Sequence, residues 1–216
     1  MSNYLALYDY RSQVAASYRE RNRALCAGED AAVVLRRFRE SKDHLFLTHS
    51  QSALDEEQRR HFHGLRYFPY NPAMCFAVTI DTHVEPKQQH IAMDARESMT
   101  MTTIGLVRFT VGEIPVELSV YWLNIYGGGM FLPFRDATYT SETYGSGRYL
   151  FDTIKGSDPV PFTNAQDEKQ IILDFNYAYN PSCSYNDRWV CPLAPAENRL
   201  DVPIPAGEKN YKEERS

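Results

Sequence analysis

The first 68 residues contain no proline and only two glycines, Gly28 and Gly64, although the chain has 12 prolines and 11 glycines. Proline breaks a helix interior and glycine weakens it, so this asymmetry predicts a helical front and a remainder built of strands and turns. No apolar run approaches the roughly 20 residues that cross a bilayer as a helix. The start, MSNYLALYDYRSQ, lacks a basic segment followed by an apolar one, so we expect no secretory signal, no membrane contact and a cytoplasmic location.

Histidine is absent after His90. A histidine-assisted nucleophile or a histidine-rich metal site would therefore have to recruit the front of the chain. Walker A, H-E-x-x-H, G-x-S-x-G and dinucleotide-binding motifs are also absent. The net charge of -5 comes without a basic stripe, which argues against a nucleic-acid partner. The sequence identifies no reaction, and we predict no cofactor.

Apolar residues at spacings of three and four predict helices over 4–26, 30–43 and 52–64. Gly28 is placed to stop the first helix. Ser52 or Asp55 is placed to cap the third, and Gly64 to end it.

Beyond Pro69, alternation and β-branched residues predict strands over 74–81, 89–95, 98–111, 116–126, 147–151 and 170–177. Their short connections favour antiparallel pairing, because parallel pairing needs long crossovers. We expect a mainly β, α+β protein: an antiparallel β-sandwich or partly closed barrel preceded by two or three N-terminal helices. The expected organisation is one domain over 1–216, with a helical segment (1–65), a β-rich core (66–206) and a frayed polar tail (207–216).

Cys183 and Cys191 are the closest pair among the four cysteines. Their spacing is not that of a zinc ribbon or a redox C-x2-C motif, and no other cysteine or histidine lies nearby to complete four zinc ligands. Three interpretations stay open: buried structural thiols, a loop-closing disulfide or redox pair, and a metal site completed by a distant histidine. We predict no metal.

Polar chemistry concentrates in FLPFRDATYTSETYGSGRYLFDTIKG and LDFNYAYN. Asp174 and Asn176 alternate with aromatic residues, which predicts that they share one strand face. Charged groups on an inward face need partners or a ligand, and arginine suits carboxylates and phosphates because guanidinium binds them bidentately. We therefore predict a ligand cavity lined by Arg135, Asp136, Tyr144, Arg148, Asp174, Asn176 and Tyr179.

For catalysis, Asp174 or Glu197 is the candidate general acid or base, and Tyr144 or Tyr179 the candidate donor to an oxyanion. The stretch from Tyr179 to Leu200 is expected to form a proline-stiffened flap over the end of the strand that carries Asp174. The alternative is that the predicted cavity residues form a buried ion-pair network that only fixes the sheet.

The runs YWLNIYGGGMFLPFRDAT, TYGSGRYL, DTIKG, LDFNYAYNPSCSY and VCPLAPAENRLDVPIPAGEK, in this order, resemble the uncharacterised prokaryotic domain-of-unknown-function family 1684. FRESKDHLF and GLRYFPYNPAM resemble its N-terminal part. The resemblance implies one β-rich domain preceded by helices. It implies no activity, cofactor or catalytic residue.

Two functions are consistent with these observations. The first is a protein that binds a small molecule, either as a binding protein alone or as an enzyme that acts on an anionic or polar small molecule. The second is a non-catalytic structural or interaction domain that forms a homodimer through exposed tyrosines, prolines and Trp189.

Overall fold

The computed structural model describes residues 3–92, 98–161 and 169–211, and it begins with three helices. They are α1 (Tyr4–Cys26), α2 (Ala31–Thr48) and α3 (Glu56–Arg60). The side chains of Asn3, Asp30 and Asp55 each accept a hydrogen bond from a backbone N–H in the first turn of the helix that follows, which satisfies donors that a helix leaves free. The predicted bounds of α1 are confirmed. α2 runs further than predicted, and α3 ends before Gly64.

The strands form two antiparallel sheets, as predicted. The five-stranded sheet has the order β2-β3-β4-β5-β6, and the three-stranded sheet has the order β1-β8-β7. The bounds are β1 (Cys75–Thr79), β2 (Gln88–Ala92), β3 (Ser98–Val111), β4 (Ile114–Leu123), β5 (Gly129–Phe134), β6 (Arg148–Asp152), β7 (Val160–Pro161) and β8 (Gln170–Asp174). Residues 93–95 of one expected strand lie outside the described residues.

Two turns explain the register of the larger sheet. Val111 pairs with Ile114, so Gly112 and Glu113 form a tight hairpin, with Gly112 at a φ of +62°, a value that favours glycine. β5 was not predicted because Pro133 argues against a central strand. The strand accommodates that proline at a register shift between Leu132 and Pro133, as bulges allow.

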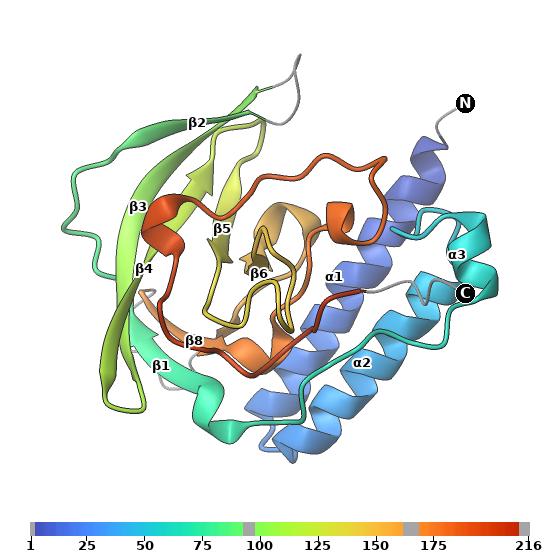
Figure 1. Ribbon diagram of the computed structural model, residues 1–216, viewed down its shortest axis with the longest axis horizontal. Helices are drawn as coiled ribbons and strands as arrows, with labels where there is room; N and C mark the ends of the chain where they lie inside the picture. The colour runs from blue at the N-terminus through green and yellow to red at the C-terminus, as the bar shows by residue number, and fades with distance from the viewer. Residues whose placement is uncertain (1–2, 93–97, 162–168, 212–216) are drawn as a thin grey trace.

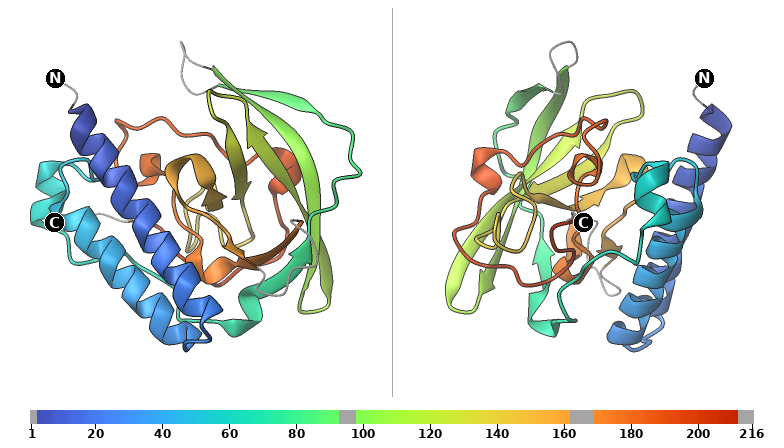
Figure 2. Two further views of the ribbon diagram at one scale, coloured as in Figure 1. Left: turned by 180° about the vertical axis from the view of Figure 1, so that it is seen from behind. Right: turned by 45° about the vertical axis from the view of Figure 1, so that its right-hand side comes forward.

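The helical hairpin α1–α2 lies on one side of the molecule and the curved five-stranded sheet on the other, with β8 and the C-terminal segment between them (Figure 1). The reverse view shows the same arrangement (Figure 2). Apolar side chains from both sheets, among them Phe134, Phe151 and Leu173, share one core with Phe175, which follows β8. The α+β class and the helices ahead of the sheets are confirmed, and within the described residues neither sheet closes into a barrel.

The chain from Gly207 to Asn210 is not the frayed tail that its polarity predicts. The Glu208 carboxylate is buried and accepts hydrogen bonds from Asn180 N–H, the Tyr185 hydroxyl and Lys42. A Cβ on Gly207 would lie 2.6 Å from the Ala178 carbonyl oxygen, so the segment packs tightly against the core. The tail prediction is therefore wrong for 207–210, where internal partners satisfy the polar groups, and residues 212–216 of the predicted tail lie outside the described residues.

None of the helices in the described part of the chain combines the length and the apolar character needed to span a bilayer.

Candidate functional site

Arg148 and Asp136 form an ion pair in the interior, with 3.0 Å between Nη2 and Oδ1 and exposed fractions of 1% and 2%. Burial lowers the pKa of Arg148, and the Asp136 carboxylate opposes that shift. The guanidinium also donates to the carbonyl oxygens of Ile204, Ala206 and Glu208. These bonds tie the start of β6 to the C-terminal segment, and they leave only Nε of Arg148 without a partner.

The second Asp136 oxygen is used as well. Oδ2 accepts hydrogen bonds from Ile204 N–H (2.7 Å), Thr138 Oγ1 (2.8 Å) and Thr138 N–H (3.2 Å). Both oxygens of the carboxylate thus have hydrogen-bond donors, as buried polar groups require. The contacts of Arg148 and Asp136 therefore match the alternative in which a buried network fixes the sheet.

Asp174 and Asn176 come together, but not as two positions on one strand face. β8 ends at Asp174, and Asn176 lies in the 3-10 helix η3 (Phe175–Tyr177). Asp174 Oδ1 accepts from Asn176 N–H (3.0 Å) and from Asn176 Nδ2 (2.8 Å). The strand-face prediction is wrong because an aspartate that caps the next turn ends the alternation.

Asn176 also holds the chain ahead of β1. Its Oδ1 accepts from Asn71 N–H (2.8 Å), and its Nδ2 donates to Asn71 O (2.9 Å). Burial raises the pKa of the Asp174 carboxyl, while its hydrogen bonds from Asn176 oppose the rise. Within the described residues no hydrogen bond or ion pair joins Asp174 and Asn176 to Arg148 and Asp136.

Arg39 of α2 also contacts the segment that carries Asn176. It donates to Phe68 O (3.0 Å) and to Asn176 O (3.4 Å), and its guanidinium lies 4.3 Å from the centre of the Tyr67 ring. Burial lowers the pKa of Arg39, and Tyr67 is the largest electrostatic influence that raises it. In contrast to Arg148, Arg39 has no ion-pair partner among the described residues.

Arg21 of α1 adds a second cation. Its guanidinium lies 4.6 Å from the ring centres of both Tyr18 and Tyr177, and it donates to Asp158 O at 2.6 Å. Burial lowers the pKa of Arg21, and nearby tyrosines and Asp174 oppose that shift. Arg21, Arg39, Tyr67, Asp174, Asn176 and Tyr177 are called the Arg39 cluster below.

The Arg39 cluster contains unpartnered buried polar atoms. Arg39 Nε and the hydroxyls of Tyr67 and Tyr177 are buried and have no hydrogen-bond partner among the described residues. Leaving a buried donor or acceptor unpaired costs about 1–3 kcal/mol. Three such atoms therefore lie on side chains of one cluster. No residue pattern distinguishes Arg21 or Arg39, because each lies 137 positions from its hydrogen-bond partner in the second half of the chain.

The remaining predicted residues lie in separate surroundings. The Arg135 guanidinium lies over the Tyr139 ring, 4.4 Å from its centre. Glu197 accepts from Gln89 Nε2 of β2, and the Tyr179 hydroxyl lies 2.7 Å from Ser157 Oγ. The Tyr144 hydroxyl donates to Cys183 Sγ at 3.7 Å. The three candidate catalytic residues, Asp174, Glu197 and Tyr144, therefore have different partners on different elements.

Cys183 and Cys191 lie next to each other and are both free thiols. Cys183 N–H donates to Cys191 Sγ at 3.4 Å, and the Cys183 side chain also hydrogen-bonds Cys191. In the part of the chain that the structure describes, no cluster of three or more histidine, cysteine, aspartate or glutamate side chains is placed to hold a metal ion. The histidine that the metal alternative requires is thus not beside this pair.

Asn198 is a residue that sequence reasoning passed over. Its fully buried amide accepts from Ser119 N–H (2.8 Å) and donates to Ser119 O (2.9 Å) and Pro133 O (2.7 Å). It therefore bonds backbone groups of β4 and β5. Glu197 is the predicted candidate, but the neutral amide of Asn198 beside it is the group that joins the two strands.

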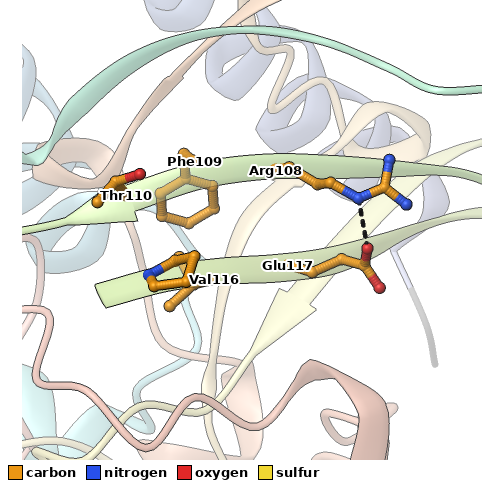
Figure 3. A pocket seen from close by; sticks show the side chains of 6 residues that line it. Arg108, Phe109, Thr110, Val116 and Glu117 are labelled. Carbon is orange, nitrogen blue, oxygen red and sulfur yellow. Dashed lines mark hydrogen bonds and ion pairs between the residues drawn. The ribbon is translucent and has the colours of Figure 1, made fainter. Parts of the chain in front are cut away.

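One open depression of about 400 Å³ lies on the β3–β4 hairpin, lined by Arg108, Phe109, Thr110, Pro115, Val116 and Glu117 (Figure 3). Arg108 donates to Glu117 Oε2 at 2.7 Å and to Asp81 Oδ2 at 2.8 Å. Its charges thus neutralise one another at the surface, and it contains no buried unpartnered polar atom. The depression is a weaker candidate for a site than the Arg39 cluster.

Residues 60–209 match the family described as "Protein of unknown function (DUF1684)". The chain belongs to this family, as the resemblance predicted. The chain is also similar to an uncharacterized protein of Haloarcula marismortui solved by solution NMR, with 30% identity, a TM-score of 0.57, and coverage of 81% of this chain and 91% of the other. A search of curated proteins gave no match. These relationships establish family and fold, and they name no ligand or reaction.

Proposed function

We propose that this protein binds a small anionic or polar molecule at the Arg39 cluster. The observation that carries the proposal is the group of three buried polar atoms without protein partners, Arg39 Nε and the hydroxyls of Tyr67 and Tyr177. Interiors satisfy the great majority of their buried polar groups. Several exceptions on adjoining side chains therefore mark a place where a bound molecule supplies the missing partners.

The charges of the cluster indicate the class of ligand. Arg21 and Arg39 bring two cations without ion-pair partners among the described residues, while Asp174 contributes one carboxyl whose pKa burial raises. Guanidinium offers paired donors that match a carboxylate or a phosphate. The proposed ligand is a small carboxylate or phosphate that also accepts or donates hydrogen bonds to tyrosine hydroxyls.

Entry to the cluster requires movement of Tyr67. Its ring covers the Arg39 guanidinium, and both side chains are only half-buried. An exposed or partly exposed side chain changes rotamer in picoseconds to nanoseconds, so the movement is easily accessible. Asp174 would lie beside the bound molecule and is the carboxyl group suited to exchange a proton with it.

Thermal unfolding in an anion-poor buffer tests the proposal, with inorganic phosphate and a panel of small mono- and dicarboxylates as probes. A ligand that binds only the folded state stabilises it by about 2.7 kcal/mol at 100 times its Kd. We expect at least one probe to raise the Tm of the wild-type protein. Arg39→Lys keeps the charge but loses the bidentate geometry, and we expect it to weaken that response at least tenfold in concentration.

Two comparison variants locate the binding. Tyr126→Phe removes a hydroxyl from a fully exposed side chain and should leave the response unchanged. Arg135→Lys changes the other arginine that lies over a tyrosine ring and tests the cavity predicted from the sequence. Loss of the response in Arg135→Lys but not in Arg39→Lys would contradict the proposal, as would a wild-type protein that no probe stabilises.

A homodimer is the second candidate, and one observation favours it. Trp122, Ile125 and Tyr126 lie exposed close together at the β4–β5 connection, a composition that interfaces share. Trp189, by contrast, donates its indole N–H to Ala53 O at 2.8 Å, so it packs within the chain. Light scattering on the wild type and on Tyr126→Ser decides this: a strict monomer removes the proposal.

A further inference from the structure

The thiol pair Cys183–Cys191 lies outside the Arg39 cluster and has its own chemistry. The Cys183 N–H points at the Cys191 sulfur from 3.4 Å, and the two side chains hydrogen-bond each other. Tyr144 donates its hydroxyl to Cys183 Sγ at 3.7 Å. A disulfide requires close, correctly directed Cβ groups, and the hydrogen bond from Cys183 N–H to Cys191 Sγ holds the two free cysteines next to each other.

The loop between the two cysteines is anchored at its outer end. Arg188 donates to the carbonyl oxygens of Ser52 and Leu54 at 3.0 Å, and Trp189 donates to Ala53 O. The loop therefore docks on the segment ahead of α3. At its base Cys183 N–H bonds Cys191 Sγ, and the Tyr149 hydroxyl bonds the carbonyl oxygen of Pro192. Joining the sulfurs would close the base of a loop whose outer end is already fixed.

The two thiols differ in their surroundings. The hydrogen bond from the Cys183 side chain lowers the pKa of Cys191 to about 6; burial opposes this, while Cys183 N–H and Lys155 assist. The same hydrogen bond raises the pKa of Cys183. The other titratable groups around the pair are Tyr144 and Tyr149, both with a pKa raised by burial. A thiolate beside a protonated thiol is the arrangement of an attacking and a resolving cysteine.

We propose that Cys183 and Cys191 are a reversible dithiol–disulfide site that a hydroperoxide oxidises, with Cys191 attacking and Cys183 resolving. The Cys191 thiolate displaces hydroxide from the O–O bond of hydrogen peroxide and becomes a sulfenic acid. The Cys183 sulfur then attacks the Cys191 sulfur, its proton combines with the departing hydroxyl group, and water leaves as the disulfide forms. A small thiol, in two equivalents, reduces the disulfide back and is itself oxidised to its disulfide.

Cys26 and Cys75 provide a control inside the same molecule. Both are exposed residues, whereas Cys191 is buried and Cys183 is half-buried. Desolvation of the thiol and the nearby Asp174 raise the pKa of Cys75 to about 12. If exposure alone governed reactivity, Cys26 and Cys75 would be oxidised before Cys191. The proposal predicts the reverse order.

The test treats the reduced full-length protein with increasing hydrogen peroxide, followed by alkylation of the remaining thiols and peptide mass analysis. We expect a linked peptide pair carrying Cys183 and Cys191, formed about tenfold faster than oxidation of either exposed cysteine and reversed by dithiothreitol. In Cys183→Ser, a cyclic diketone probe should trap Cys191 as sulfenic acid. In Cys191→Ser, Cys183 should stay reduced at the same peroxide concentration.

The order of reaction in the wild-type protein needs no variant, so a variant that misfolds does not remove the test. Oxidation of Cys26 and Cys75 ahead of an unreacted pair would overturn the proposal. A Cys191 that is oxidised but never linked to Cys183 in the wild type would overturn it too.

Discussion

Arg148, fully buried, and Arg39, half-buried, both lie beside aromatic rings, and their partners differ. Arg148 meets one carboxylate and three backbone carbonyl oxygens. Arg39 meets two carbonyl oxygens and forms no ion pair among the described residues, while Nε is unpaired in both arginines. Both residues would look equally suited to an anion if judged by type alone. The carboxylate partner, present at Arg148 and absent from Arg39 among the described residues, separates a structural clamp from a candidate site.

The difference has a physical basis. A buried ion pair that loses one partner leaves an uncompensated charge, so a structural arginine is expected to have its charge compensated by a carboxylate. A binding arginine must keep capacity for its ligand, and the empty protein carries the cost of the unpaired atoms. The following predictions test this contrast between Arg148 and Arg39.

The largest effect is expected at the clamp. Asp136→Ala removes the carboxylate that faces buried Arg148 and three further hydrogen bonds. The free energy of unfolding should fall by about 3–5 kcal/mol, measured by urea unfolding followed through tryptophan fluorescence. A loss below about 1 kcal/mol would mean that Asp136 is not structural.

Asn198→Ala should come next, with a loss of about 2–4 kcal/mol, because it leaves buried backbone groups of Ser119 and Pro133 without their partner. Asn124→Ala is the matched control. Its amide donates to Thr102 at an exposed position, so the change should stay within about 0.5 kcal/mol. Equal effects of the two variants in urea unfolding would refute the role given to Asn198.

Tyrosine hydroxyls offer a finer test of the Arg39 cluster. Tyr67→Phe and Tyr177→Phe delete hydroxyls without protein partners, so in ligand-free protein they should leave stability unchanged or raise it by up to about 1 kcal/mol. Tyr185→Phe deletes a hydroxyl that donates to buried Glu208 and should cost about 1–3 kcal/mol. Equal changes in the free energy of unfolding of the three variants, measured by calorimetry, would contradict the distinction between hydroxyls with and without partners.

The smallest expected effect is a shift in the pKa of Cys191. Cys183→Ala removes the hydrogen bond that contributes most to lowering the pKa of Cys191, so this pKa should rise above 6. The ultraviolet absorbance of the thiolate reports it in a protein with Cys26 and Cys75 replaced by serine. Since the folded pKa of Cys191 lies below the ordinary 9.0, its contribution to stability is present above pH 9 and is lost as the pH falls through about 6. An unchanged titration would remove Cys183 as the cause.

Local patterns predicted much of the fold. The bounds of α1 and β3 follow from apolar spacing, the Gly28 stop and the Gly112 turn, all of which act within a few residues. The residue pattern does not predict β5, because a strand tolerates Pro133 only through the register shift in its pairing with β6. Asn176 was placed on a strand because the cap that Asp174 forms is a geometric fact that alternation does not encode.

The site was predicted only where its members are neighbours in sequence. Asp136 and Arg148 lie in one polar stretch and do pair, although as a clamp. Arg21 and Arg39 are on helices whose exposed faces also carry arginines, and nothing local distinguishes them. Glu208 looked like part of a solvated tail, and its burial depends on Lys42, Asn180 and Tyr185 far away in the chain. Pairing between polar groups that are far apart in the sequence is therefore the feature of the site that local residue patterns cannot predict.

A crystal structure of the full-length protein soaked with the anion that raises its Tm most is the most direct test of the central claim. The account predicts density for that anion in hydrogen-bond contact with Arg39 Nε and with the hydroxyl of Tyr67 or Tyr177, while Arg148 keeps its bonds to Asp136 and the C-terminal segment. Crystals in which those three atoms are bonded to other protein groups, with the anion elsewhere, would contradict it.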